Sequence, residues 1–317
     1  MPGAARNRVS QVVGPRTSLI TTEAVPDVGV GQLLIRVLIN GVCASDLSDW
    51  NSADSQVRLG HEPVGEVVAL GPGVEGISIG DVVAGRIDPS LCEFAVAEQA
   101  DAVVVPAGLR PEAALGEPLG CVVEAVRRTK IDAGDRIVLV GAGFMGLCLL
   151  QLLRHTLSCQ VVAVDSRTDA RQHALTHGAD EALDPAAAER LEPFPPGGEP
   201  GFDVAFEASG SQSGLDLAAR LVRAQGTLSI LGYHQGIRTV DMQAWNWKAI
   251  DVVNAHVRDR ARLRDSIKRG LDLAAAGRVD VRSLITHRYA LDDVDAAFTA
   301  LVDKPDGFIK AIVEIGG

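Results

Sequence analysis

Several features that mark other classes of protein are scarce or missing in this sequence of 317 residues. Its apolar stretches are interrupted by charge or glycine well short of the about 18 residues that a membrane-spanning helix needs, so we expect no membrane association. Lys and Arg number 30 against 41 Asp and Glu, and no dense basic block stands out from a formal net charge of −11. Because such a chain repels a phosphate backbone, we expect no nucleic-acid partner.

Cysteine is also scarce. The five cysteines are scattered and odd in number, which argues against a disulfide framework in a chain of this size. Residues 1–6 lack the apolar core of a secretory signal, so we expect a cytoplasmic protein with reduced thiols. With 47% hydrophobic and 22% charged residues, the chain has enough apolar material for two globular domains.

The first third of the sequence has a β pattern. Between Gly31 and about Val105, short β-type runs are separated by glycine, which predicts a compact, mostly β domain. The predicted strands are Leu33–Val37, Gly65–Gly71, Asp81–Ala84 and Ala102–Val105.

The middle of the sequence alternates strands with helices, which predicts parallel βαβ units and a doubly wound α/β sheet. Residues 193–200, with four prolines and two glycines, predict a surface loop. The five predicted strands are Arg136–Val140, Gln160–Val164, Phe202–Phe206, Thr227–Leu231 and Asp251–Ala255.

The last third adds a long amphipathic helix over Leu263–Ala276 and a closing strand over Phe308–Ile315. A terminal strand needs a partner, and we expect it to return to the N-terminal β domain. That domain therefore comprises residues 1–117 and 258–317, and a dinucleotide-binding domain comprises residues 118–257.

A glycine motif follows the first strand of the βαβ region. Gly141, Gly143 and Gly146 enclose Phe144 and Met145, and an apolar helix begins there. In this context the first glycine allows a tight turn, the second the approach of a pyrophosphate, and the third close packing of helix on strand. The helix N-terminus directs N–H groups at the phosphates, so the motif predicts a dinucleotide site.

Asp165 ends the next predicted strand, 19 residues after Gly146. There a carboxylate accepts hydrogen bonds from the adenosine ribose and repels a 2′-phosphate, which favours NAD over NADP. Arg167 and Arg171 follow closely and offer the alternative of holding that phosphate.

A second constellation lies upstream of the glycine motif. Cys43 precedes His61 by 18 positions, a spacing that is weak evidence for a metal site by itself. A catalytic zinc takes three protein ligands and an open position. The third ligand is either Glu62 or Glu117, and the spacing does not choose between them.

Taken jointly, these motifs resemble the zinc-dependent medium-chain dehydrogenase/reductase superfamily, in particular its polyol (sorbitol) and threonine dehydrogenase-like branches. The resemblance covers nearly the whole chain and is carried by these segments together with the glycine motif: Gly41–Asp46, Gly60–Glu62, Gly65–Val68, Glu117–Leu119 and Leu284–His287.

The resemblance implies a GroES-like β domain joined to a Rossmann domain. It implies that Cys43 and His61 bind a catalytic zinc, with Glu62 as a direct or exchanging ligand and Glu117 at the position of the family's remaining donor. It further implies that Ser45 relays the alcohol proton, and that Asp46 orients the histidine ligand.

The sequence departs from the family in two places. The family often has a histidine three residues after the relay hydroxyl, where this chain has Ser48, so the proton route differs or runs through water. Residues 85–94 run almost directly between two strands with only Cys92, so the lobe that carries four cysteines for a structural zinc is missing. We predict one catalytic zinc per chain and no structural zinc.

The sequence therefore predicts oxidation of a secondary alcohol (polyol, cyclitol or amino alcohol) to a ketone with zinc and NAD. The small-molecule alcohol or ketone is the expected partner, in a homodimer or homotetramer. Two alternatives stay open: a zinc-free quinone or enoyl reductase of the same superfamily that uses NADPH, and a non-catalytic dinucleotide-binding protein.

Overall fold

The computed structural model describes residues 6–53, 56–156, 158–191 and 201–316. Its Cα atoms cluster into two compact units, residues 1–120 with 258–317 and residues 121–257. The loop predicted over residues 193–200 falls outside the described residues. Within the described ranges, no helix is long and apolar enough to cross a membrane.

The first unit is built on a mixed β-sheet. The order of its strands in the sheet is β14-β15-β3-β4-β5-β7, and β6 also pairs with β3. A separate two-stranded sheet, β1 with β2, was not predicted. The strands of this unit are β1 (Arg6–Gly14), β2 (Thr17–Ala24), β3 (Gln32–Gly41), β4 (Pro63–Leu70), β5 (Val82–Gly85), β6 (Phe94–Glu98), β7 (Ala102–Val104), β14 (Ile285–Ala290) and β15 (Lys310–Glu314).

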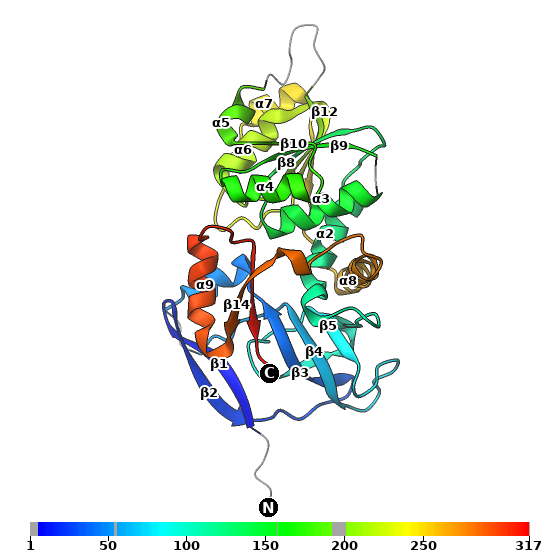
Figure 1. Cartoon of the computed structure of the whole chain (residues 1–317), viewed down its shortest axis with the longest axis vertical. Helices are drawn as coiled ribbons and strands as arrows, with labels where there is room; N and C mark the ends of the chain where they lie inside the picture. The colour runs from blue at the N-terminus through cyan, green and yellow to red at the C-terminus, as the bar shows by residue number, and fades with distance from the viewer. Residues whose placement is uncertain (1–5, 54–55, 157, 192–200, 317) are drawn as a thin grey trace, which may run out of the picture. The chain divides into compact units, whose positions relative to one another are not determined.

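The closing strand returns to the N-terminal sheet, as predicted. β15 pairs antiparallel with β3 and parallel with β14, so segments from the two ends of the sequence lie side by side (Figure 1). Its residues 311–313 are fully buried. The helices of this unit are α1 (Leu47–Trp50), α8 (Arg260–Ala275) and α9 (Val294–Asp303), and α2 (Gly116–Arg128) continues into the second unit.

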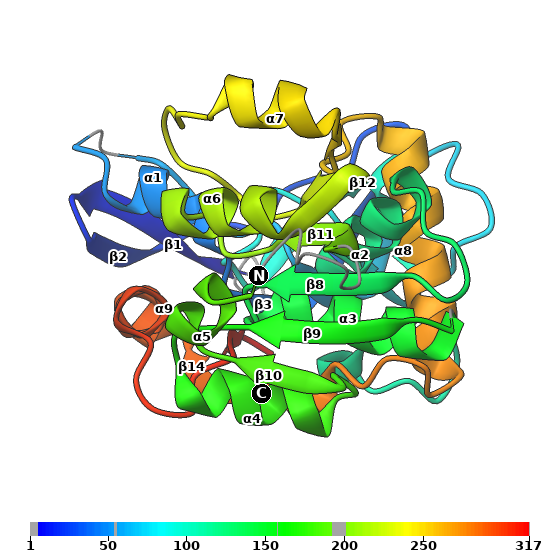
Figure 2. The same cartoon turned by 90° about the horizontal axis from the view of Figure 1, so that it is seen from above.

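The second unit is a parallel sheet with the strand order β10-β9-β8-β11-β12-β13 (Figure 2). The five predicted strands are present, which confirms the doubly wound α/β class. A sixth strand, β10, was missed because three residues carry no readable periodicity. The elements are β8 (Arg136–Val140), β9 (Gln160–Val164), β10 (Glu181–Leu183), β11 (Phe202–Glu207), β12 (Val222–Ile230), β13 (Asp251–Asn254), α3 (Phe144–Thr156), α4 (Thr168–Thr176), α5 (Pro185–Glu189), α6 (Gln212–Leu221) and α7 (Met242–Lys248).

The apolar runs of the sequence become the core of this sheet. Ile137, Val138 and Leu139 of β8 are each 0% exposed, because helices cover both faces of a doubly wound sheet. The strand order reverses between β9 and β11 on either side of β8, and ligands of such sheets bind at the carboxyl edge of that point.

Candidate active site

The register of β3 and β4 brings the predicted metal ligands together. Asn40 of β3 is opposite Pro63 of β4, and the N–H of Gly41 donates to the carbonyl of Glu62 at 3.1 Å. Cys43 follows the end of β3, and His61 directly precedes Glu62. The pairing of the two strands therefore places residues 18 positions apart at one end of the sheet.

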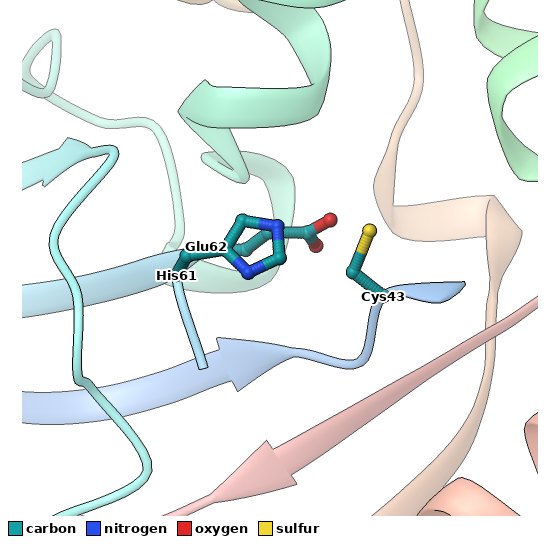
Figure 3. A group of neighbouring side chains, drawn as sticks. All are labelled: Cys43, His61 and Glu62. Carbon is teal, nitrogen blue, oxygen red and sulfur yellow. The ribbon is translucent and has the colours of Figure 1, made fainter. Parts of the chain in front are cut away.

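Three donor side chains converge there. Ligand atoms of Cys43, His61 and Glu62 all lie within 4.8 Å of one another, with Cys43 half-buried and the other two buried (Figure 3). Glu117, in the first turn of α2, lies outside this group. A thiolate, an imidazole and a carboxylate are the donors that zinc prefers, and three protein ligands leave a position open for substrate.

The orientation of His61 is fixed by Asp46. Its Nδ1 lies 2.9 Å from Asp46 Oδ1, and because a carboxylate only accepts, Nδ1 carries the proton. This leaves Nε2 as the atom that can bind a metal, the arrangement expected of a histidine ligand. The second oxygen of Asp46 is buried and has no hydrogen-bond partner among the described residues. The donor set and this orphaned oxygen both fit a cation at the site.

The electrostatics of the group also fit a cation. Burial disfavours charge on His61, but its hydrogen bonds to Asp46 and Cys43 outweigh burial and raise its pKa to about 12. In the absence of metal, His61 therefore carries an additional proton among acidic side chains. A bound metal ion would supply positive charge at the site in place of that proton.

Lys310, the first residue of β15, is a part of the site that the sequence did not reveal. Its ammonium donates to Glu62 Oε2 at 2.6 Å and to the carbonyl of Val42 at 2.9 Å. Burial opposes its charge, but the charges of Glu62 and Cys43 keep its pKa above the ordinary value. The feature of the sequence that could have indicated this role is a charged lysine within the apolar strand predicted over Phe308–Ile315. Gly41 makes room for the pair, because a Cβ there would overlap with Glu62 Oε2.

Ser45, the predicted relay, and Ser48, at the position of the family's histidine, are placed differently. Ser45 Oγ donates to Cys43 Sγ at 3.3 Å and lies 3.3 Å from His61 Nε2, so it borders the donor group. Ser48 is exposed, and its hydroxyl reaches the carbonyl of Ser45 at 3.5 Å, the outer limit of a hydrogen bond. The structure thus brings Ser45 to the donors, whereas Ser48 reaches the backbone of Ser45.

The glycine motif forms the turn between β8 and α3. Gly141 has a φ of +104°, and a Cβ there would come within 2.6 Å of the backbone nitrogen of Ser209. A Cβ on Gly146 would overlap with the carbonyl oxygen of Gly141, whereas no atom of the part of the chain that the structure describes lies within 4 Å of a Cβ on Gly143. Gly143 is therefore where a ligand can approach the backbone. Phe144 and Met145 begin α3, buried and half-buried respectively.

Asp165 joins the end of β9 to that turn. Its Oδ2 accepts from the N–H of Ala142 at 2.8 Å, and its Oδ1 accepts from the N–H of Arg167 at 2.9 Å. The guanidinium of Arg167 lies 3.3 Å from Asp169, and that of Arg171 donates to the carbonyls of residues 165 and 166. The carboxylate therefore lies beside the glycine turn, and both arginines have protein partners.

Comparisons with known proteins add to this geometry. Residues 29–126 match the family model of the alcohol dehydrogenase GroES-like domain, and residues 145–275 match that of the zinc-binding dehydrogenases. The L-threonine 3-dehydrogenase of Pyrococcus horikoshii is 29% identical over 313 residues, which cover 86% of this chain and 89% of the relative. The sorbitol dehydrogenase of Bacillus subtilis is 25% identical over 333 residues, 93% of each chain.

A solved structure is similar throughout. A chain described as a zinc-binding dehydrogenase of Sinorhizobium meliloti, bound to NADP, superposes with a TM-score of 0.85 at 23% identity, covering 98% of this chain and 99% of the other. At that identity the likeness concerns the fold.

Proposed function

Because the chain belongs to the zinc-dependent medium-chain dehydrogenase superfamily, we propose that it oxidises a secondary alcohol to a ketone with one catalytic zinc and NAD. The family makes it an oxidoreductase of the zinc-type alcohol dehydrogenases that binds a nicotinamide dinucleotide. We propose a polyol, cyclitol or amino alcohol as its substrate, in keeping with the names of its relatives. The grouping of Cys43, His61 and Glu62 carries the proposal.

Each side chain of the site has a role in this reaction. Cys43, His61 and Glu62 hold the metal, and Asp46 keeps the proton on His61 Nδ1 so that Nε2 stays available. Ser45, 3.3 Å from His61 Nε2, would relay the proton that the alcohol loses, accepting it as its own hydroxyl proton passes to water. Zinc, when bound, supplies Lewis-acid chemistry that lowers the pKa of a hydroxyl. NAD, when bound, supplies the hydride acceptor.

The preference for NAD rests on Asp165. Its carboxylate borders the turn that would bind the pyrophosphate, where it accepts hydrogen bonds from ribose hydroxyls and repels a 2′-phosphate. Arg167 and Arg171 are engaged by Asp169 and by backbone carbonyls, which leaves them poorly arranged for a phosphate.

We also propose a homodimer or homotetramer. β13 is the end strand of its sheet, and Val252 on it is 44% exposed. Trp247 of α7 is 88% exposed. An unpaired strand edge beside exposed apolar side chains pairs readily with a second copy. Light scattering measures the molar mass of the unaltered protein and of a Trp247→Glu variant, in which we expect weaker association. A monomeric mass for the unaltered protein contradicts the proposal.

The decisive experiment measures zinc in purified, metal-replete protein, its Cys43→Ser variant and a Cys121→Ser control. We expect about one zinc per chain in the unaltered protein and the control. In Cys43→Ser we expect the zinc to be lost. We expect the NAD-dependent oxidation of a panel of polyols, cyclitols and amino alcohols, shown by the unaltered protein, to be lost with it. Folded protein without zinc contradicts the proposal, and NADPH-dependent reduction of activated double bonds then becomes the activity to test.

A further inference from the structure

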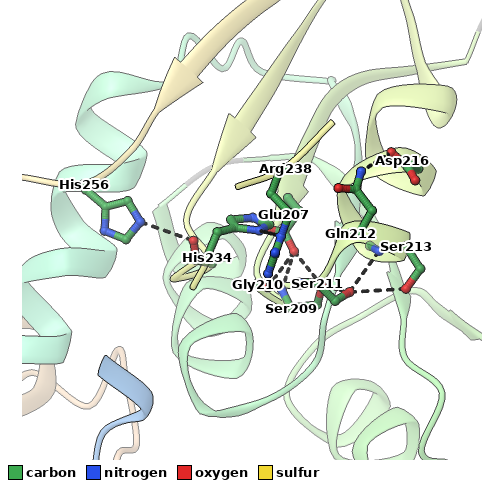
Figure 4. Close-up of polar contacts among 12 residues, drawn as sticks. Glu207, Ser209, Gly210, Ser211, Gln212, Ser213, Asp216, His234, Arg238 and His256 are labelled. Atoms are coloured by element: carbon green, nitrogen blue, oxygen red, sulfur yellow. Dashed lines mark hydrogen bonds and ion pairs between the residues drawn. The ribbon is translucent and has the colours of Figure 1, made fainter. Parts of the chain in front are cut away.

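A buried carboxylate organises the carboxyl edge of the parallel sheet. Glu207, the last residue of β11, is 0% exposed. Its Oε1 accepts from the N–H groups of Ser209 at 2.7 Å and Gly210 at 2.8 Å, and from the Ser209 hydroxyl at 2.6 Å. Its Oε2 lies 2.7 Å from Nε2 of His234, which follows β12 (Figure 4). One carboxylate thus ties together the loops that leave two neighbouring strands.

The tautomer of His234 follows from its second partner. Arg238 Nε lies 3.0 Å from His234 Nδ1, and a guanidinium nitrogen only donates, so Nδ1 must accept. The proton therefore resides on Nε2, from which it is donated to Glu207. His234 thus bridges a buried anion and a cation, with one partner for each ring nitrogen.

The same network holds the peptide groups of Gly210 on both sides. Its N–H donates to Glu207, and its carbonyl accepts from the guanidinium of Arg238 at 3.0 Å. Gly210 has a φ of +67°, and a Cβ there would come within 2.6 Å of the carbonyl oxygen of Tyr233. Its conformation therefore depends on the Glu207–His234–Arg238 chain.

The Gly210 turn contacts the glycine turn of the dinucleotide motif. The N–H of Ala208 donates to the carbonyl of Val140 at 2.8 Å, and a Cβ on Gly141 would come within 2.6 Å of Ser209 N. A Cβ on Gly232, after β12, would come within 2.4 Å of the backbone nitrogen of Gly210. The loops after β8, β11 and β12 thus touch without intervening side chains, beside the point where the strand order reverses.

The strand order indicates which part of a dinucleotide this network serves. A doubly wound sheet binds one mononucleotide on each half, and the half that carries Asp165 takes the adenosine. Glu207 and His234 belong to the other half, β11-β12-β13, which takes the nicotinamide mononucleotide. Given the dinucleotide binding assigned under the proposed function, on which this inference rests, the network lies on the nicotinamide side.

We propose that His234, locked between Glu207 and Arg238, is a positioning residue for the nicotinamide half of the cofactor. It touches no reacting atom. It holds the Gly210 turn against Gly141, so that the edge of β8 and β11 is already shaped for the nicotinamide mononucleotide when the cofactor arrives. Neither the glycine motif nor Asp165 provides this function, because both lie on the adenosine side or at the pyrophosphate.

The test compares binding of NADH and of ADP, which lacks the nicotinamide and its ribose, by the unaltered protein and three variants. His234→Phe removes both hydrogen bonds. His234→Gln restores them, because one amide offers a donor to Glu207 and an acceptor to Arg238. His173→Phe, on α4 of the adenosine half, is the matched control. Calorimetry gives the affinities, and thermal unfolding without ligand reports stability.

We expect His234→Phe to weaken NADH binding about tenfold or more, the equivalent of one lost charge-assisted hydrogen bond, and to leave ADP binding within about twofold. His234→Gln should regain most of the NADH affinity, and His173→Phe should match the unaltered protein. If the binding of both ligands weakens equally, or if NADH binding is unchanged, this inference is overturned and the proposed function is not. Absence of NADH binding by the unaltered protein overturns the proposed function as well.

Discussion

Lys310 lies buried beside Glu62, with its ammonium 2.6 Å from one carboxylate oxygen. Both charges are withdrawn from water, and the carbonyl of Val42 satisfies a further N–H of the lysine. Removing one partner of such a pair leaves an uncompensated buried charge, which is far more costly than the net worth of the pair. This contact connects the last strand of the sheet to the candidate metal ligands.

Lys310→Met should destabilise the protein by about 3–5 kcal/mol and weaken zinc binding, because Glu62 loses the cation that orients it. Urea unfolding and competition with a chelator measure the two effects. Lys268→Met is the control, since its exposed ion pair with Asp272 contributes well under about 1 kcal/mol. A Lys310 variant as stable as the control contradicts the role of the pair.

Asp46→Asn should weaken zinc binding about 10- to 100-fold, the usual cost of losing the group that orients a metal-bound histidine. An amide accepts the Nδ1 proton less strongly than a carboxylate and carries no charge. Asp49→Asn, an exposed change in the adjacent helix α1, should leave the affinity unaltered. Equal affinities of the two variants would remove Asp46 from the site.

Zinc binding should strengthen as pH rises. Without metal, the pKa of about 12 keeps His61 protonated through the neutral range, and zinc must displace that proton. Each expelled proton raises the apparent association constant about tenfold per pH unit, so affinity is lost towards acid. Chelator competition between about pH 6 and 8 gives the slope. A flat profile is incompatible with His61 as a ligand.

Asp165→Ser should move the cofactor preference from NAD towards NADP. The change removes the acceptor for the ribose hydroxyls and the charge that repels a 2′-phosphate, with an expected shift in the affinity ratio of about tenfold or more. Fluorescence titration with NADH and NADPH gives the ratio. Glu181→Gln, which removes an exposed carboxylate from β10, serves as control. Tighter binding of NADPH by the unaltered protein contradicts the prediction.

Zinc should protect Cys43 from alkylation. Cys43 is half-buried, and burial raises the pKa of Cys92 to about 12, which keeps that thiol unreactive. Iodoacetamide should therefore label Cys43 in metal-free protein and spare it after zinc is added, whereas Cys92 stays unmodified throughout. Peptide mass spectrometry locates the label. Labelling of Cys43 that is indifferent to zinc would exclude it as a ligand.

Local patterns predicted much of the fold. Residues 136–140 and 160–164 are continuous apolar strands, and they end where the sequence predicted. The two-stranded sheet of β1 and β2 was missed because polar residues fill most of β2, whose burial alternates only between partial and exposed. The alternation of apolar and polar residues is visible in a sequence where one face of the strand is fully buried. It weakens where neither face of the strand is fully buried.

The site divides in the same way. Cys43 and His61 were predicted because short motifs flank them, whereas Lys310 was not, because its partner Glu62 is 248 residues away in sequence. The spacing left Glu62 and Glu117 as equal candidates, and the pairing of β3 with β4 is what groups the former with the other donors. Contacts between distant segments follow from topology, which no local pattern encodes.

The position of β15 between β3 and β14 has a consequence for biosynthesis. Residues 121–257 emerge from the ribosome before Lys310 is translated, so the dinucleotide-binding unit can fold on the nascent chain while the first unit waits for β15. Until then, β3 has an open edge and Glu62 has no counter-ion. A premature stop codon before residue 310 would therefore yield a polypeptide with one folded half and one aggregation-prone half, whatever zinc the cell supplies.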